Sequence, residues 1–202
     1  MLKNADKRGL KHRLVRIKKP TFILVVAVSL DGKITNGKKE GTEWTSKEDQ
    51  KFFRGELDRA DVVILGRKTF EAIPRPLTPR NRIVFSQRKP AVIPAPARRS
   101  PLGAGGEAGI QDTFYFHGTP RELLNHCAKC RWNRVVIAGG TSIYQWFLKH
   151  KLVDEMYITV EPIVFGSGKP FLAEGSFAEN WTLVSVKKLN KSGTLLLHYL
   201  HS

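Results

Sequence analysis

Five short apolar runs in the first two thirds of the chain constrain its fold more than any other feature. They are rich in β-branched and aromatic residues, and most carry apolar residues at consecutive positions. Consecutive apolar residues over so short a length are typical of parallel strands that are buried on both faces of a sheet. The runs are FILVVAV (22–28), DVVIL (61–65), RIVF (82–85), TFYFH (113–117) and RVVIA (134–138).

Helix signals stand between several of these runs. Thr45 with Glu48, and Thr119-Pro120 with Glu122, match the capping box, in which a hydroxyl and a carboxylate satisfy the first free N–H groups of a helix. The alternation predicts an α/β fold with a single mixed, mostly parallel sheet flanked by helices. After residue 154 the helix signals stop, and three further patterns predict antiparallel strands at the sheet edge. These patterns are EMYITVEPIV (155–164), WTLVSVKKL (181–189) and TLLLHYL (194–200).

The chain divides into a basic tail and one domain. Its 202 residues, 41% of them hydrophobic, suffice for one continuous core, so we predict a tail at 1–20 and a domain at 21–202. Residues 88–111, rich in Pro, Ala and Gly, predict a flexible surface excursion. Apolar residues at helical spacing in the tail permit a basic amphipathic helix for RNA, anionic lipid or an acidic partner. A disordered solubilising tail is the favoured interpretation, because the segment is short.

Charge and hydropathy exclude some classes of protein. The formal net charge of +16 suits a polyanionic ligand, either a nucleic acid or a phosphorylated cofactor or substrate. The longest apolar run, Phe22 to Val28, is far shorter than the roughly 20 residues of a membrane-spanning helix. Two cysteines and no cleavable apolar segment at the N-terminus argue against a disulfide-stapled secreted protein. We therefore expect a soluble, cytoplasmic protein.

The two cysteines, Cys127 and Cys130, have the Cys-x-x-Cys spacing of zinc knuckles and of thioredoxin-type sites. The sequence has no second such pair, and the capping box at Thr119 places both thiols in or near one helix. His117 and His126 would be the remaining ligands if the pair held zinc. Structural thiols are the favoured interpretation, and no metal site is predicted.

Three turns that directly follow predicted strands carry residues suited to anions. Gly66-Arg67-Lys68-Thr69 precedes a helical pattern, and free N–H groups together with a guanidinium, an ammonium and a hydroxyl suit a pyrophosphate or a 2′-phosphate. Gly139-Gly140-Thr141-Ser142-Ile143 and Ser86-Gln87-Arg88 follow two other strands. Neither the Gly-x-Gly-x-x-Gly fingerprint nor a P-loop occurs after a strand. Three such turns predict one ligand crossing the sheet edge, although each alone could be an ordinary solvated connection.

These turns, in this order, carry a resemblance to a known family. ILGRKTFEAI, IVFSQR and VVIAGGTSIYQWFL resemble dihydrofolate reductases and the reductase domain of riboflavin-biosynthesis enzymes, the RibD C-terminal domain, over about residues 21–200. The resemblance implies a dihydrofolate reductase-like fold and an NADPH cofactor. It implies further that Arg67, Lys68 and Thr69 contact phosphates and that Gly139 to Ile143 carry the pyrophosphate. Ser86 and Arg88 would flank the adenosine 2′-phosphate. Ala27 and Ile34 would lie by the nicotinamide.

Two other segments resemble the riboflavin branch more than a typical folate enzyme. They are SLDGKI (29–34) and LVDEMYITVEPIVFGSGKPF (152–171). This resemblance implies hydride transfer from NADPH to a (ribosylamino)pyrimidine-like, phosphorylated substrate, as in 5-amino-6-(5-phosphoribosylamino)uracil reductase. It places Ser29, Asp31 and Lys33 on the substrate side and implies a homodimer. Asp31 is a predicted catalytic residue, with a simple turn residue as the alternative.

Asp49 is the second predicted catalytic residue, as proton donor or substrate clamp. It lies five residues after Trp44 and four before Phe53, the arrangement by which folate reductases present an acid to the pterin. Asp49 and Phe53 share one helix face, and partial burial beside both aromatic rings would raise the pKa of the carboxyl. Trp44 and Phe53 thus join the predicted substrate contacts. The alternative is a solvated first-turn acid favoured by the helix dipole.

Two departures from the family pattern leave the substrate open. Riboflavin reductases often carry an acid where this chain has Ala138, and the His-x-Glu and Pro-Cys-x-x-Cys signature of the deaminase half is absent from the sequence. Dihydrofolate reduction is the alternative activity. An alternative from another class is a basic nucleic-acid-binding protein that keeps the fold without turnover, with the tail as its contact.

Overall fold

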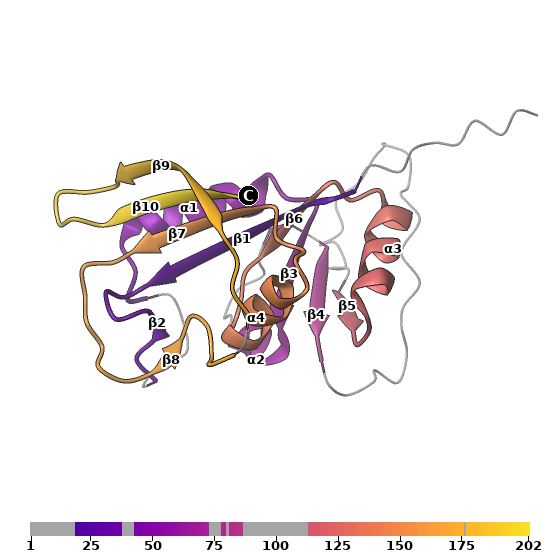
Figure 1. The fold of residues 1–202 in the computed structure, drawn as a ribbon, viewed down its shortest axis with the longest axis horizontal. Helices are drawn as coiled ribbons and strands as arrows, with labels where there is room; N and C mark the ends of the chain where they lie inside the picture. The colour runs from indigo at the N-terminus through magenta and orange to yellow at the C-terminus, as the bar shows by residue number, and fades with distance from the viewer. Residues whose placement is uncertain (1–18, 38–42, 73–77, 80, 87–112, 176) are drawn as a thin grey trace, which may run out of the picture.

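The computed structural model describes residues 19–37, 43–72, 78–79, 81–86, 113–175 and 177–202 (Figure 1). Within them, one eight-stranded sheet has the order β5-β4-β3-β6-β1-β7-β10-β9, and β2 (Lys33–Thr35) pairs with β8 (Lys169–Pro170) in a small second sheet. The strands of the large sheet are β1 (Thr21–Val28), β3 (Val62–Gly66), β4 (Arg82–Phe85), β5 (Thr113–Phe116), β6 (Arg134–Ile137), β7 (Glu155–Val160), β9 (Trp181–Lys188) and β10 (Leu195–His201).

The sheet is mixed and mostly parallel, as the sequence predicts. All five apolar runs form strands, and these pair in parallel as neighbours from β5 to β1. The prediction for the segment after residue 154 was wrong for β7, which is parallel to β1 and antiparallel only to β10. The physical reason is that a helix connects β6 to β7, and such a crossover returns the chain in the same direction. The β9–β10 pair is antiparallel, as predicted.

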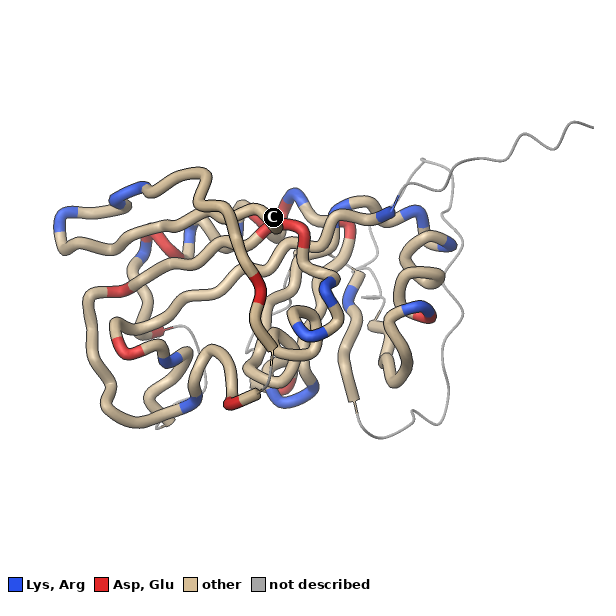
Figure 2. Tube along the Cα trace, in the orientation of Figure 1, with Lys and Arg blue, Asp and Glu red and all other residues tan. Residues whose placement is uncertain are grey.

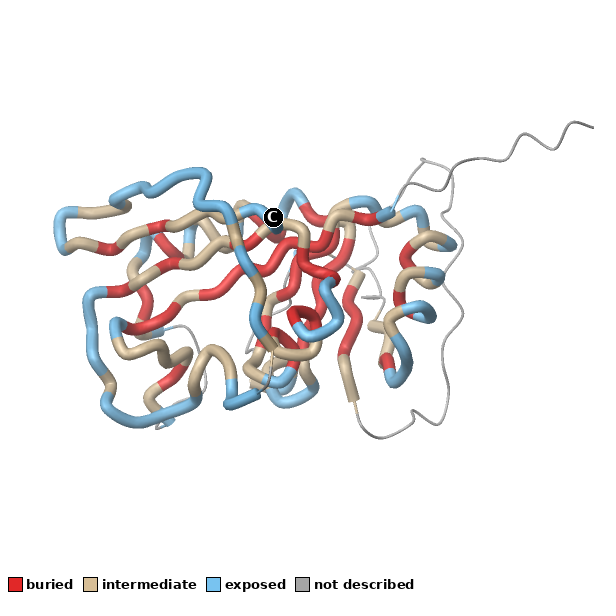
Figure 3. Tube along the Cα trace, in the orientation of Figure 1, coloured by how far each residue is buried: buried red, intermediate tan, exposed pale blue. Residues whose placement is uncertain are grey.

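Helices cover both faces of the sheet. They are α1 (Lys47–Asp58), α2 (Arg67–Glu71), α3 (Pro120–Cys130) and α4 (Thr141–Lys149). The alternating side chains of β1 separate the two layers: Phe22, Leu24 and Val26 pack with residues of α3 and α4, whereas Ile23 and Val25 pack with residues of α1 and α2. Figure 3 shows the buried residues concentrated on these central strands, while β9 at the sheet edge is exposed almost throughout.

The two predicted capping boxes had different outcomes. At α3 the box is present, with Thr119 and Glu122 bonded reciprocally and Pro120 in the first turn. At α1 the prediction was wrong by one residue: Ser46 is the N-cap, and its hydroxyl accepts a hydrogen bond from the N–H of Asp49 at 3.2 Å. The Thr45 side chain is instead buried and bonded to the Asp49 carboxyl. The first turn of α1 is therefore capped from Ser46, with Asp49 in the third helical position.

Charge is spread over the described domain. Figure 2 shows Lys and Arg positions interspersed with acidic ones on helices and loops, while the β9–β10 hairpin carries basic positions without acidic ones. Residues 1–18 of the predicted tail and the whole excursion at 88–111 lie outside the described residues, so neither the tail's conformation nor the excursion is tested. Among the residues that the structure does describe, no helix has both the length and the apolar character needed to cross a membrane.

Candidate functional site

The carboxyl ends of β4, β3, β6 and β1 lie next to one another because these strands are consecutive neighbours in the sheet. Parallel strands end at the same edge, so the turns after them meet there. The N–H of Gly66 donates to the carbonyl oxygen of Gly139 at 2.7 Å, which joins the turn after β3 to the turn after β6. Ser86 ends β4 at the same edge, whereas Gln87 and Arg88 lie outside the described residues. The predicted meeting of these turns is thus confirmed for the described residues.

The glycines of these turns permit a close approach that no larger residue would allow. Gly139 has a φ of +111°, and a Cβ there would lie 3.0 Å from the Tyr144 hydroxyl oxygen. A Cβ on Gly140 would lie 3.2 Å from Oγ1 of Thr69. The peptide bond between the two glycines is cis. The glycine pair thus lets the start of α4 approach the start of α2 closely.

The four helices differ in how their N-termini are capped. The first turns of α1 and α3 receive side-chain caps from Ser46 and Thr119. By contrast, α2 and α4 begin after Gly66 and Gly140, and neither has a side-chain cap. Uncapped N–H groups at a helix N-terminus attract anions. The two helices without a side-chain cap are the two that begin at the glycine turns.

Some side chains around these turns are exposed to solvent, and others are held by contacts within the protein. Arg67 and Lys68 are exposed, and Arg67 makes a surface ion pair with Glu71 at 3.0 Å, of a kind that is easily broken. Ser142 is exposed as well. The Thr141 hydroxyl is already used, because it donates to the carbonyl oxygen of Pro170 and so ties α4 to β8. The Ile143 side chain is buried and lies against Gly66, so only its backbone can face a ligand.

Two predicted nicotinamide contacts lie between the glycine turns and the acid. Ile34 on β2 reaches toward Gly140, where its Cδ1 would lie 4.0 Å from an added Cβ. Ala27 is partly exposed on β1, and its partner in the parallel register of β7 is Thr159. Thr159 in turn bonds the carboxyl of Asp49. Ile34 thus lies beside the glycine turns, and Ala27 lies beside the threonine that bonds Asp49.

Asp49 is a buried carboxyl, with only 5% of its surface exposed. Burial raises its pKa, and the negative charge of Glu161 adds to this, while hydrogen bonds from Thr159 and Thr45 act in the opposite direction. The solvated first-turn acid that was the alternative interpretation is therefore excluded. A buried carboxyl of raised pKa can hold a proton and deliver it to a neighbouring heteroatom.

Trp44 and Phe53 flank the acid from opposite ends of the same segment. The Trp44 ring packs edge-on against Phe165, with centroids 5.0 Å apart, and its indole nitrogen is buried without a hydrogen-bond partner among the described residues. Phe53 is half-buried and packs against the cluster that holds α1 to the sheet. Trp44 also lines a pocket of about 250 Å³, together with Thr45, Ser46, Glu161, Pro162, Ile163, Asn190, Ser192 and Thr194.

Asp31 does not fit the predicted catalytic role. Its carboxylate accepts hydrogen bonds from the Ser29 hydroxyl at 2.6 Å and from the N–H groups of Phe165 at 3.0 Å and Gly166 at 2.9 Å. These bonds lower its pKa to about 2, so it carries no proton to donate near neutral pH. Ser29 is likewise committed, since its hydroxyl also accepts from the N–H of Lys33. Asp31 and Ser29 hold the β1–β2 turn to the loop at 165–166, which agrees with the alternative interpretation of Asp31 as a turn residue, and their place on the substrate side stays a prediction.

Four residues that face Asp49 were not among the predicted site residues. They are Thr45, Thr159, Glu161 and Tyr144. Tyr144 is fully buried, its hydroxyl donates to the carbonyl oxygen of Val25 at 3.0 Å, and burial with the charge of Asp49 raises its pKa. Period-2 alternation along β7 places Thr159 and Glu161 on one face, but only the pairing of β7 with β1 brings that face to Asp49.

The cysteines belong to the packing of α3. Cys127 is fully buried in the core, and burial raises the pKa of its thiol to about 12, which makes it unreactive. Cys130 is partly exposed, with its sulfur 3.8 Å from Nε2 of His126. Both thiols are free. No group of three or more potential metal ligands was found among the described residues.

Comparisons with known proteins agree with this geometry. A family model described as the RibD C-terminal domain matches residues 20–195. The uncharacterized protein YwjB of Bacillus subtilis (strain 168) is 31% identical over 193 residues, which cover 89% of this chain and 97% of the relative. Both matches extend over the glycine turns and Asp49, so they include the whole described site.

Solved structures show the same fold at lower identity. A diaminohydroxyphosphoribosylaminopyrimidine deaminase/5-amino-6-(5-phosphoribosylamino)uracil reductase from Thermotoga maritima has a TM-score of 0.66 at 16% identity, covering 91% of this chain and 57% of its own. Dihydrofolate reductase from Enterococcus faecalis, complexed with NADP(H) and RAB-propyl, has a TM-score of 0.63 at 22% identity, covering 90% and 96%. With the family model and the 31% identical relative, these matches show that the chain belongs to the RibD C-terminal domain family, a reductase-type oxidoreductase family with the dihydrofolate reductase-like fold.

Proposed function

We propose that this protein is an NADPH-dependent reductase that transfers a hydride to a (ribosylamino)pyrimidine-like substrate, such as 5-amino-6-(5-phosphoribosylamino)uracil. One observation carries the proposal: two glycine turns with uncapped helix N-termini stand at the same sheet edge as a buried carboxyl of raised pKa. The first arrangement suits a dinucleotide, and the second suits proton delivery. Membership in the RibD C-terminal domain family supports the combination.

The proposed cofactor contacts follow the sheet edge. Gly66 to Thr69 and Gly139 to Ile143 would hold the phosphates through backbone N–H groups and the exposed Arg67 and Lys68. Ser86, with Arg88 beside it in the sequence, would face the adenosine 2′-phosphate. Ala27 and Ile34 would border the nicotinamide. The cofactor, when bound, supplies the hydride, and the protein supplies orientation and the proton.

The proposed role of Asp49 is to complete the reduction. Hydride addition to the carbon of a C=N or C=O bond leaves an electron pair on the heteroatom, which must take up a proton. Asp49 gives its carboxyl proton to that heteroatom and becomes a carboxylate, which Thr159 and Thr45 stabilise by hydrogen bonding. Trp44 and Phe53 border the space for the heterocycle. A proton from solvent then restores the acid.

A titration followed by turnover tests the proposal. We expect NADPH fluorescence to increase on binding, and to do so far less in the variant Gly140→Val, in which the side chain would meet Thr69. The matched control is Gly55→Val, because a Cβ at Gly55 has no atom within 4 Å. Oxidation of NADPH should then require 5-amino-6-(5-phosphoribosylamino)uracil. No fluorescence change together with salt-sensitive RNA binding would instead support the nucleic-acid alternative.

Dihydrofolate reduction is the second candidate, because a buried acid near the start of the first helix is paired here with a fold shared with dihydrofolate reductases. The loop that Asp31 holds favours the riboflavin branch, since it joins the two segments that carry that resemblance. Methotrexate separates the two candidates. Tight inhibition together with turnover of dihydrofolate would overturn the riboflavin-type substrate and leave the cofactor assignment intact.

A further inference from the structure

A second buried carboxylate, Glu161, lies beside the proposed acid and has no part in the proposed reaction. Only 4% of its surface is exposed. Its Oε1 accepts a hydrogen bond from the N–H of Ser46 at 2.8 Å, and its Oε2 accepts one from the Thr194 hydroxyl at 2.7 Å. These described partners are neutral donors. Burying a carboxylate against neutral groups costs free energy of folding, so the presence of Glu161 calls for an explanation.

The hydrogen bonds around Glu161 suit a carboxylate, because both of its oxygens can act as acceptors. The side-chain oxygen of Asn190 accepts from the N–H groups of Gly193 at 3.1 Å and Thr194 at 3.2 Å, which fixes the amide orientation. Its nitrogen therefore donates to Oγ1 of Thr194 at 2.9 Å, and the hydroxyl of Thr194 is free to donate onward to Glu161. With both oxygens accepting, Glu161 has the bonding pattern of a carboxylate anion.

The same contacts connect Glu161 to Asp49. Ser46 donates its N–H to Glu161, while its hydroxyl accepts the N–H of Asp49. Glu161 also follows Thr159 at the i+2 position, so both side chains point to the same side of the sheet, and Thr159 bonds Asp49. The N–H of Glu161 donates to the carbonyl oxygen of Val28 at 2.8 Å, which continues the β1–β7 ladder and fixes the backbone. The negative charge of Glu161 is thereby held close to the Asp49 carboxyl.

We propose that Glu161 is a positioning residue for Asp49: its fixed negative charge opposes ionisation of the Asp49 carboxyl, and its bond to Ser46 holds the start of α1 against the β9–β10 turn. A like charge nearby disfavours ionisation of a carboxyl, so Glu161 adds to the effect of burial and helps Asp49 to hold a proton. The catalytic use of that proton rests on the proposed function. The electrostatic interaction between the two carboxyl groups does not depend on it.

Carbon NMR of protein labelled with [4-¹³C]aspartate tests the proposal without cofactor or substrate. The Asp49 resonance is identified by its loss in Asp49→Asn, and its titration midpoint is compared between the wild type and Glu161→Gln. Glutamine keeps the size of the side chain and, through its amide oxygen, the bond from the N–H of Ser46, while its amide nitrogen would donate to the Thr194 hydroxyl oxygen, and the charge is removed. We expect the midpoint to fall by about one pH unit, the scale of a close like-charge interaction in a partly polar interior.

The matched control is Glu155→Gln, which removes a carboxylate from β7 six residues earlier in the chain and should leave the midpoint unchanged. A midpoint that does not move in Glu161→Gln, or that moves equally in Glu155→Gln, overturns the proposal. If Glu161→Gln does not fold, the double variant Glu161→Leu/Thr194→Val replaces both partners by apolar groups of similar shape, and the same fall is expected. A lowered midpoint in a protein that never oxidises NADPH would refute the proposed function and leave this inference standing.

Discussion

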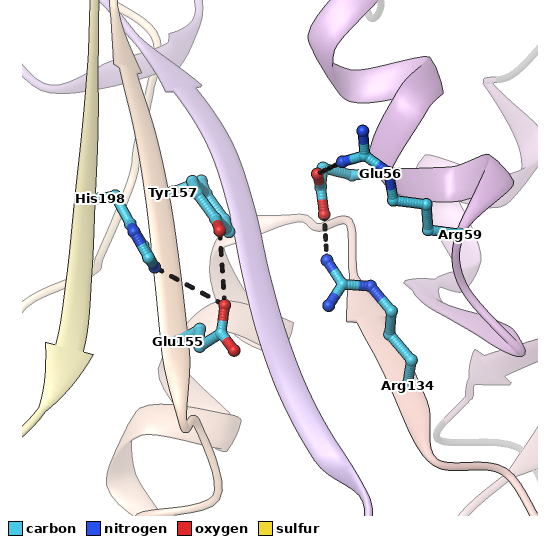
Figure 4. A network of polar contacts seen from close by, with 6 residues as sticks. All are labelled: Glu56, Arg59, Arg134, Glu155, Tyr157 and His198. Carbon is cyan, nitrogen blue, oxygen red and sulfur yellow. Dashed lines mark hydrogen bonds and ion pairs between the residues drawn. The ribbon is translucent and has the colours of Figure 1, made fainter. Parts of the chain in front are cut away.

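Helix α1 carries two buried acids whose surroundings differ completely. Glu56 is 2% exposed and pairs with two arginines: Arg59 at 2.7 Å, and Arg134 from the start of β6 (Figure 4). Asp49, two turns earlier and 5% exposed, meets threonine hydroxyls and a second carboxylate. An acid that is neutralised by cations contributes to the fold, whereas an acid kept from them has a perturbed pKa available for chemistry.

Strands β7 and β10 carry further polar side chains that pair with one another. Figure 4 shows Glu155 between Tyr157 and His198, with its Oε2 accepting from the Tyr157 hydroxyl at 3.4 Å and lying 3.6 Å from Nε2 of His198. The rings of Tyr157 and His198 stack with centroids 4.3 Å apart. These groups pack at the amino ends of β6 and β7, away from the edge that carries the glycine turns. These paired groups therefore lie at the amino ends of the strands, whereas the proposed chemistry takes place at the carboxyl ends.

The largest expected effect comes from removing the acid at the reactive end. Asp49→Asn keeps the size of the side chain but cannot deliver the proton, so we expect the single-turnover rate of NADPH oxidation to fall by about 10²–10³-fold. NADPH affinity, measured by fluorescence, should remain within a factor of about two, because Asp49 is not a proposed phosphate contact. A rate close to that of the wild type would mean that the proton comes from elsewhere.

Removing the other acid should affect stability instead of rate. Glu56→Gln leaves Arg134 without its charge partner, and we expect the free energy of unfolding to fall by about 2 kcal/mol, less than for a fully buried pair because Arg134 is 31% exposed. Urea unfolding measures the loss. The rate of NADPH oxidation by the folded fraction should be unchanged. An equal loss of rate in both variants would erase the distinction between the two ends.

The effect of removing Asp49 on stability should depend on pH. The folded-state pKa of Asp49 is raised, so its ionisation costs stability as pH rises from the unfolded pKa of about 3.9 to the raised folded value. Asp49→Asn removes that cost. Above the folded pKa we expect the variant to be more stable than the wild type, and below the unfolded pKa the difference should vanish. Urea midpoints between pH 4 and 8 measure the trend, and a variant that is less stable than the wild type at pH 8 would contradict it.

The sequence predicted the glycine edge better than the surroundings of the acids. Gly66 and Gly139 follow strands that can be recognised from the sequence, and adjacent parallel strands end at the same edge. The local sequence pattern was therefore enough to predict where the two turns lie. Glu56 meets Arg134 only through packing between elements 78 residues apart. Glu161 meets the cap of Asp49 only because β7 runs parallel to β1, contrary to the prediction. The turn contacts of Asp31 could not be predicted from local pattern either, since its partners lie 134 and 135 residues away in the chain.

The smallest expected effect is the loss of stability on replacing Arg59, the more exposed of the two arginines that pair with Glu56. Arg59 is 68% exposed and lies one helical turn from Glu56, so water solvates most of its charge and the pair contributes little. Arg59→Met should therefore cost about 0.3 kcal/mol, whereas Arg134→Met should cost roughly as much as Glu56→Gln, because Arg134 ties α1 to β6. Urea unfolding of the two variants, read against Glu56→Gln, gives the ranking. Equal losses would mean that Glu56 needs both cations, and that its burial depends on total charge instead of on the one arginine that crosses from the sheet.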